Sequence, residues 1–184
     1  MTIHVPVGPW TDDCQMVGHD PSSCPFWQTA GYLGRPPERL VVDGLRLWAA
    51  GHASGRCEPW AVAARLYASA LGERGDLALV CLAHWVNAID RWRPEGLRTQ
   101  AAGCPSIASD ECLGAAMIAA CQHGDADCLA LTAARLSGPA GQTDVIEAAC
   151  GLAHALAGLG HVLMPVPADV LRSLVDPPPT RSRH

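Results

Sequence analysis

Three residues near the N-terminus combine the side-chain types that bind zinc. Cys14, His19 and Cys24 are spaced with four residues on each side of the histidine. Thiolate sulfur and imidazole nitrogen are preferred zinc ligands, and a fourth ligand, with Cys57 as one candidate, would complete a tetrahedral site. The spacing lacks the short C-x2-C knuckle of common zinc sites. Two packed thiols beside a surface histidine are therefore the favoured interpretation.

A second set of metal-binding side-chain types lies nearer the C-terminus. On a helix, Cys150, His154 and His161 share one stripe with Glu147. Sulfur and imidazole donors on one helix face are suited to binding a transition metal or to titrating near neutral pH. A solvated polar face explains the same pattern and is the favoured interpretation.

The remaining candidate groups favour packing over chemistry. Cys112, Cys121 and Cys128 do not share a helix face, which is typical of thiols buried in a core or a helical hairpin. A metal site formed by Cys121, His123 and Cys128 is the less favoured alternative. His84 and Asp90 lie on one narrow polar face and have the side-chain types for acid–base work. No nucleophile accompanies them in the pattern, so a solvent-exposed edge or a buried polar contact is the favoured interpretation.

The sequence contains none of the short motifs that accompany common catalytic sites. Phosphate-binding loops, dinucleotide-binding glycine patterns, H-E-x-x-H and G-x-S-x-G are all absent from it. These absences favour a non-catalytic protein without excluding an enzyme.

Composition predicts a folded, acidic domain. The chain has 184 residues, of which 49% are hydrophobic and 17% charged, values that fit one globular domain. No apolar stretch reaches the roughly 18 residues of a membrane-spanning helix, and the first residues do not resemble a secretory signal. The net charge is −5 and the arginines are scattered, which excludes a clustered basic face for nucleic acid. We therefore expect a cytoplasmic protein that binds neither membrane nor nucleic acid.

Cysteine is unusually frequent. The chain has nine cysteines, so at least one thiol lacks a partner within the chain even if the others form disulfides. In the cytoplasm we expect reduced thiols that are buried as small apolar side chains.

Proline, glycine and the hydrophobic periodicity divide the chain into three parts. We expect an irregular N-terminal arm over residues 1–37, a helical domain over 38–175 and a flexible, proline-rich C-terminal tail over 176–184. Strand patterns are nearly absent. The predicted fold is all-α, either a compact bundle or a short array of helical hairpins with about six or seven helices.

Capping residues and apolar stripes mark several helices. Asp125 or Asp127 is expected to cap a fifth helix that closes near Gly138, and Asp144 to cap a sixth. Leu77 belongs to a broad apolar face on the third helix, which predicts contacts with several neighbours. A core stripe on the sixth helix is formed by six residues: Val145, Ala149, Leu152, Leu156, Leu159 and Leu163.

These patterns lead to two hypotheses from different classes. The first is a non-catalytic helical domain for protein–protein interaction, with no cofactor, that self-associates or binds a larger protein. The alternative is a metal- or redox-linked protein that uses one of the two Cys/His sets, with zinc or another transition metal as its cofactor. A small-ligand pocket between helices is a third hypothesis, which the residue pattern does not address.

Overall fold

Helices dominate residues 32–175, the part of the chain that the computed structural model describes, with backbone alone at positions 168 and 173–175. The five long helices are α1 (Pro36–Ser54), α2 (Glu58–Leu71), α3 (Gly75–Trp92), α4 (Ser109–His123) and α5 (Ala126–Ala157). A 3-10 turn, η2 (Gly72–Arg74), joins α2 to α3, and the short helix α6 (Ala168–Val175) follows α5. No strand occurs within this range, which confirms the predicted all-α class.

The prediction of six or seven helices exceeds the number of long helices in the described residues, which is five. The segments predicted as a fifth and a sixth helix are continuous in α5, but a kink at Gly138, whose φ of 68° and ψ of 175° are non-helical, divides α5 at the predicted position. Asp125 caps α5, as predicted, by accepting a hydrogen bond from a backbone N–H. The predicted cap at Asp144 is wrong, because this residue lies inside α5 and its carboxylate accepts a hydrogen bond from Trp92 Nε1 at 3.0 Å.

The predicted arm and tail lie mainly outside the described residues. The arm was expected over 1–37, of which the structure describes only 32–37, and α1 already begins at Pro36. The tail over 176–184 lies wholly beyond the described range.

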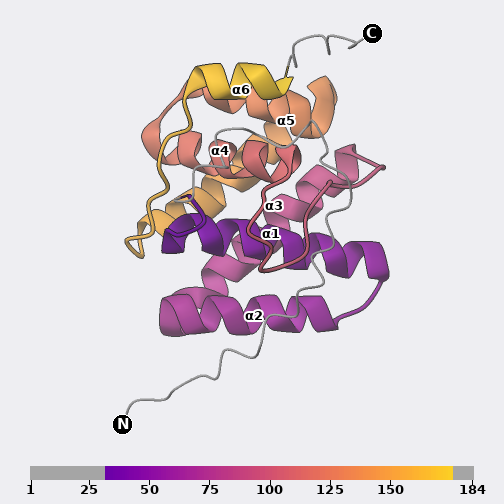
Figure 1. The fold of residues 1–184 in the computed structure, drawn as a ribbon, viewed down its shortest axis with the longest axis vertical. Coiled ribbons are helices and arrows are strands. Elements are labelled where there is room, and N and C mark those ends of the chain that lie inside the picture. The colour runs from indigo at the N-terminus through magenta and orange to yellow at the C-terminus, as the bar shows by residue number, and fades with distance from the viewer. Residues whose placement is uncertain (1–31, 176–184) are drawn as a thin grey trace, which may run out of the picture.

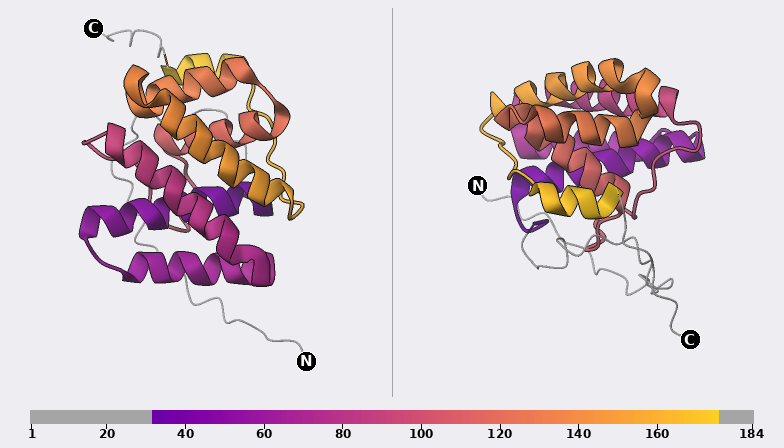
Figure 2. Two further views of the ribbon diagram at one scale, coloured as in Figure 1. Left: turned by 180° about the vertical axis from the view of Figure 1, so that it is seen from behind. Right: turned by 90° about the horizontal axis from the view of Figure 1, so that it is seen from above.

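The helices pack in an arrangement with α4 at its centre. α1 and α2 form a hairpin at one end of the molecule, and α6 lies at the opposite end (Figure 1). α3 and the second half of α5 run side by side across the back (Figure 2). α4 packs against α5, α1 and their neighbours so closely that every residue from Asp110 to Ala120 is buried.

The core combines aliphatic side chains with one fully buried tryptophan, Trp85. Of the predicted core stripe, five members are buried, whereas Leu159 is half-buried just beyond the end of α5. The buried members are Val145, Ala149, Leu152, Leu156 and Leu163. Small residues let the helices approach one another. At Gly114 on α4, for example, an added Cβ would lie 3.0 Å from the ring of Trp85.

A buried ion pair joins α1 to the start of α4. The guanidinium of Arg46 donates two hydrogen bonds to the carboxylate of Glu111, at 2.8 Å from Nε and 2.9 Å from Nη2. The exposed fractions of the two side chains are 1% and 0%. Burial by itself opposes the charge on Arg46, yet the hydrogen bonds and the charge of Glu111 raise its pKa overall. Arg46 therefore stays charged inside the protein.

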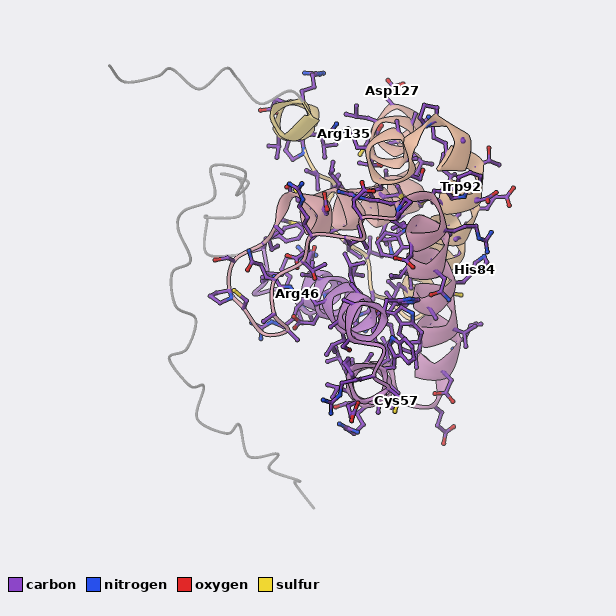
Figure 3. All side chains as sticks on the ribbon, turned by 90° about the vertical axis from the view of Figure 1, so that its right-hand side faces the viewer. Arg46, Cys57, His84, Trp92, Asp127 and Arg135 are labelled. Carbon is purple, nitrogen blue, oxygen red and sulfur yellow. The ribbon has the colours of Figure 1, made fainter. Side chains whose placement is uncertain are left out.

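The same pair fastens the long loop between α3 and α4, toward which Arg46 points (Figure 3). Arg46 donates hydrogen bonds to the carbonyl oxygens of Cys104, at 2.8 Å, and of Ser106. Glu111 accepts a hydrogen bond from the backbone N–H of Gln100 at 2.7 Å. Because the loop has no regular secondary structure, these side chains satisfy backbone groups that a helix would pair internally.

A second buried carboxylate holds the segment that follows α5. Glu38 on α1 has an exposed side-chain fraction of 0%. It accepts hydrogen bonds from the backbone N–H of Met164 at 2.8 Å and from Arg35 Nε. The chain after α5 is thereby tied to the first turn of α1.

Candidate functional site

The predicted N-terminal zinc ligands Cys14, His19 and Cys24 lie outside the described residues. Cys57, the candidate fourth ligand, is exposed immediately before α2 (Figure 3). Between positions 32 and 175, no three His, Cys, Asp or Glu side chains form a group that could hold a metal ion. The zinc hypothesis for this set therefore rests on the sequence alone.

The structure does not bring the second predicted set together. His154 is exposed on α5, and its Nδ1 lies 2.7 Å from the carbonyl oxygen of Cys150, one turn earlier in the same helix. His161 lies beyond the end of α5, where its own carbonyl oxygen accepts a hydrogen bond from the side chain of Gln122 at 2.9 Å. In the described part of the chain, the three residues do not form a metal-binding group.

The thiol of Cys150 contacts a cysteine from another helix. Its Sγ lies 3.2 Å from Sγ of Cys121, near the end of α4, and donates a hydrogen bond to it. Both side chains are half-buried. In the sequence, Cys121 is assigned to packing and Cys150 to a polar face, and no spacing indicates that they meet. The contact arises from the packing of α4 against the second half of α5.

Burial raises the pKa of three thiols, those of Cys81, Cys121 and Cys128. It raises the pKa of Cys121 far above its ordinary value, and the hydrogen bond and charge of Cys150 act in the same direction. Burial also raises the pKa of Cys128 to about 11 and that of Cys81 in the same direction. Because the thiolate is the nucleophilic form, Cys121 and Cys128 are expected to react slowly at neutral pH.

Alkylation should therefore distinguish the cysteines. Iodoacetamide is expected to modify exposed Cys57 of the folded chain before Cys121 and Cys128, with the order read by peptide mass mapping. The folded chain keeps these two protons at a pH where the unfolded chain releases them, so the free energy of unfolding should fall as the pH rises above about 9. Alkylation in urea, where the three sites should react alike, is the control. Equal rates in the folded chain would contradict the assignment.

A polar and aromatic cluster joins α1, α2 and α3 at the surface. His52 Nε2 lies 2.7 Å from Asn87 Oδ1, and His52 Nδ1 lies 3.7 Å from Asp90 Oδ2. Trp48 donates a hydrogen bond from Nε1 to the same Asn87 oxygen at 3.3 Å. The rings of Trp48 and Trp60 lie 5.6 Å apart. Since both ring nitrogens of His52 face α3, the cluster serves to link helices.

His84 is exposed on α3 and points away from the body of the protein (Figure 3). Asp90 was predicted to share the polar face of His84, but its carboxylate lies beside His52, a residue of α1. The acid–base pair considered from the sequence is therefore not formed, and of the two predicted alternatives His84 takes the solvent-exposed one.

An open apolar groove lies between the start of α3 and the end of α5. Its volume is about 490 Å³. The residues that line it are Glu73, Arg74, Asp76, Leu77, Ala155, Gly158 and Leu159. Leu77 exposes 64% of its surface, as does Val80, one turn later on α3. The sequence places Leu77 on a broad, helix-contacting face, but the side chain of Leu77 is left uncovered at this groove.

The described tryptophans have smaller exposed fractions than Leu77 and Val80. Trp85 is fully buried, and Trp48 and Trp60 are half-buried against one another. Trp92 is 38% exposed, with its Nε1 bonded to Asp144. Among the large hydrophobic side chains of the described residues, the largest exposed fractions therefore belong to Leu77 and Val80 on α3.

No protein family, curated protein or solved structure matches this chain. Among its described helices, none is both long and apolar enough to cross a membrane. Inference about function therefore starts from the two arrangements above, the thiol contact and the apolar groove.

Proposed function

We propose that this chain is a non-catalytic helical domain that binds another protein through the apolar groove and the adjacent Val80. The observation that carries the proposal is the 64% exposure of both Leu77 and Val80. Three residues apart on α3, they lie on one face of the helix. Exposed apolar side chains beside a groove favour a partner, because covering them removes apolar surface from water.

The charges around the groove favour a basic partner segment. Its rim carries the carboxylates of Glu73 and Asp76 and the guanidinium of Arg74, and the whole chain has a net charge of −5. Like charge opposes association with a second copy of this chain. An amphipathic helix inserts apolar side chains three or four residues apart into such grooves. The proposed partner is therefore an amphipathic helix with basic residues beside its apolar face.

We also place the domain in the cytoplasm, where the reducing environment keeps thiols such as exposed Cys57 reduced. A metal-linked role for Cys14, His19 and Cys24 stays a prediction from the sequence.

Synthetic helices provide a direct test of the groove. A peptide with leucine on one face and lysine on the other is expected to bind the full chain, whereas its leucine–glutamate counterpart is not. Substituting Leu77→Glu should weaken binding at least about tenfold, because it places a carboxylate in the apolar contact. Fluorescence anisotropy of the labelled peptide gives the affinity.

Val62→Glu is the matched control. Val62 lies on α2 and is 40% exposed, so this substitution adds the same charge at an apolar surface position outside the groove lining. The control should bind the basic peptide as tightly as the unaltered chain. Equal weakening by both substitutions, or no binding of the basic peptide, would overturn the proposal. So would light scattering that shows a stable dimer dispersed by Leu77→Glu, because the groove would then face a second copy.

A further inference from the structure

Cys121 and Cys150 lie closer together than two thiols that merely pack against each other. Their sulfur atoms are 3.2 Å apart, whereas a disulfide requires about 2.05 Å. The remaining approach of about 1.2 Å is within reach of small side-chain rotations. The two residues are 29 positions apart and belong to two well-packed helices. The fold thus places two thiols in contact without a rearrangement of the backbone.

The surroundings leave this pair accessible to a small oxidant. Both side chains are half-buried, in contrast to Cys128, which is buried and whose Sγ lies 3.8 Å from the carbonyl oxygen of Ala116. A third thiol, Cys81, lies close to the backbone of Gly151, 4.0 Å from where a Cβ would stand. Neighbouring thiols are therefore present, but the described structure brings only Cys121 and Cys150 into sulfur–sulfur contact.

We propose that Cys121 and Cys150 are a redox modification site that a low-molecular-weight disulfide, RSSR, converts to an intramolecular disulfide. The thiolate of one cysteine attacks RSSR, forms a protein–SR mixed disulfide and releases RS⁻. The thiolate of the other attacks the protein sulfur of that mixed disulfide, which forms the Cys121–Cys150 bond and releases a second RS⁻. Two protein thiols are oxidised, RSSR is reduced to two RSH, and the two thiol protons end on the released RS⁻ groups.

The second step is favoured by proximity. Since the partner thiol already lies in contact, the mixed disulfide is resolved within the molecule faster than a second RSSR can reach the site. The product links α4 to the second half of α5 and closes a loop across the Gly138 kink. Such a link removes conformational freedom mainly from the unfolded chain, so oxidation should stabilise the fold.

Oxidation of the full chain by glutathione disulfide tests the site. Reduced protein is incubated at mildly alkaline pH, where more thiolate is present, then alkylated and mapped by mass spectrometry. The expected product is a crosslinked Cys121–Cys150 peptide pair that has lost two hydrogen atoms and is reversed by dithiothreitol. The Tm of the oxidised protein should rise by about 5–10 °C.

Variants separate this pair from its neighbours. Cys121→Ser and Cys150→Ser should each abolish the crosslink and the Tm increase and leave a glutathione adduct on the remaining cysteine. The Cys81→Ala and Cys128→Ser variants should retain both the crosslink and the Tm increase. Circular dichroism verifies the fold of each variant. The proposal is overturned if the dominant crosslink joins Cys121 to Cys128 or Cys81, or if the unaltered chain accumulates adducts without a crosslink. Because these readouts involve no peptide partner, they are independent of the groove.

Discussion

Substituting Arg46→Met is expected to lower the free energy of unfolding by about 3–5 kcal/mol, the cost of removing one partner from a buried ion pair. Arg46 and Glu111 are 1% and 0% exposed, so the carboxylate left behind has no access to water. The loop between α3 and α4 loses its hydrogen bonds to the guanidinium at the same time. Urea denaturation followed by circular dichroism measures the change.

A surface arginine provides the control for this prediction. Arg56 donates hydrogen bonds to Glu58 with similar geometry, but the two side chains are 69% and 63% exposed. Arg56→Met should therefore change stability far less, because water solvates the remaining carboxylate. The double variant Arg46→Met, Glu111→Leu should recover part of the loss, since it buries no unpaired charge. A loss for Arg46→Met no larger than that for Arg56→Met would show that the pair is solvated.

Substituting Trp85→Ala is expected to cost a similar amount, about 3–5 kcal/mol, through the cavity that it leaves. Trp85 is 0% exposed and packs against α4, where a Cβ at Gly114 would lie 3.0 Å from its ring. The closely packed helices around it have little room to collapse into the space. The same denaturation experiment gives the free energy of unfolding.

Trp85→Phe separates the cavity from any polar contribution. Within residues 32–175, the buried Nε1 of Trp85 has no hydrogen-bond acceptor. Replacing Trp85 by phenylalanine therefore removes a buried polar group that makes no stabilising hydrogen bond. This variant should lose less than half as much stability as Trp85→Ala. A loss as large as that of the alanine variant would indicate that Nε1 has an acceptor and that the prediction is wrong.

Local signals accounted for much of the helical framework. Asp125 caps α5 because a carboxylate at that position satisfies an unpaired N–H, and Gly138 marks the kink because glycine readily adopts a positive φ. Both effects act within one turn of chain, so they can be recognised from neighbouring residues. Asp144 is the exception, because a tertiary hydrogen bond from Trp92 engages the side chain that the pattern assigned to a cap.

The candidate sites were much less predictable. Periodicity places Cys150 on a polar stripe and Leu77 on an apolar one, yet the first contacts Cys121 and the second lies at an open groove. A helical pattern describes one helix and carries no information on which helix covers each face. The predicted set of Cys150, His154 and His161 does not form a metal-binding group in the described part of the chain for a different reason. α5 ends before His161, so the helical period that aligned the three residues does not extend to it.

By itself, the sequence determined the all-α class, most of the core stripe in the second half of α5 and the interruption at Gly138, and it limited the α5 cap to Asp125 or Asp127. These features depend on interactions within a few residues and on the burial of apolar side chains. Only the tertiary structure decided that Arg46 meets Glu111, 65 positions away, and that two half-buried thiols come into contact. Such contacts depend on how whole helices pack, and that packing is set by the sum of many side-chain contacts rather than by any local pattern.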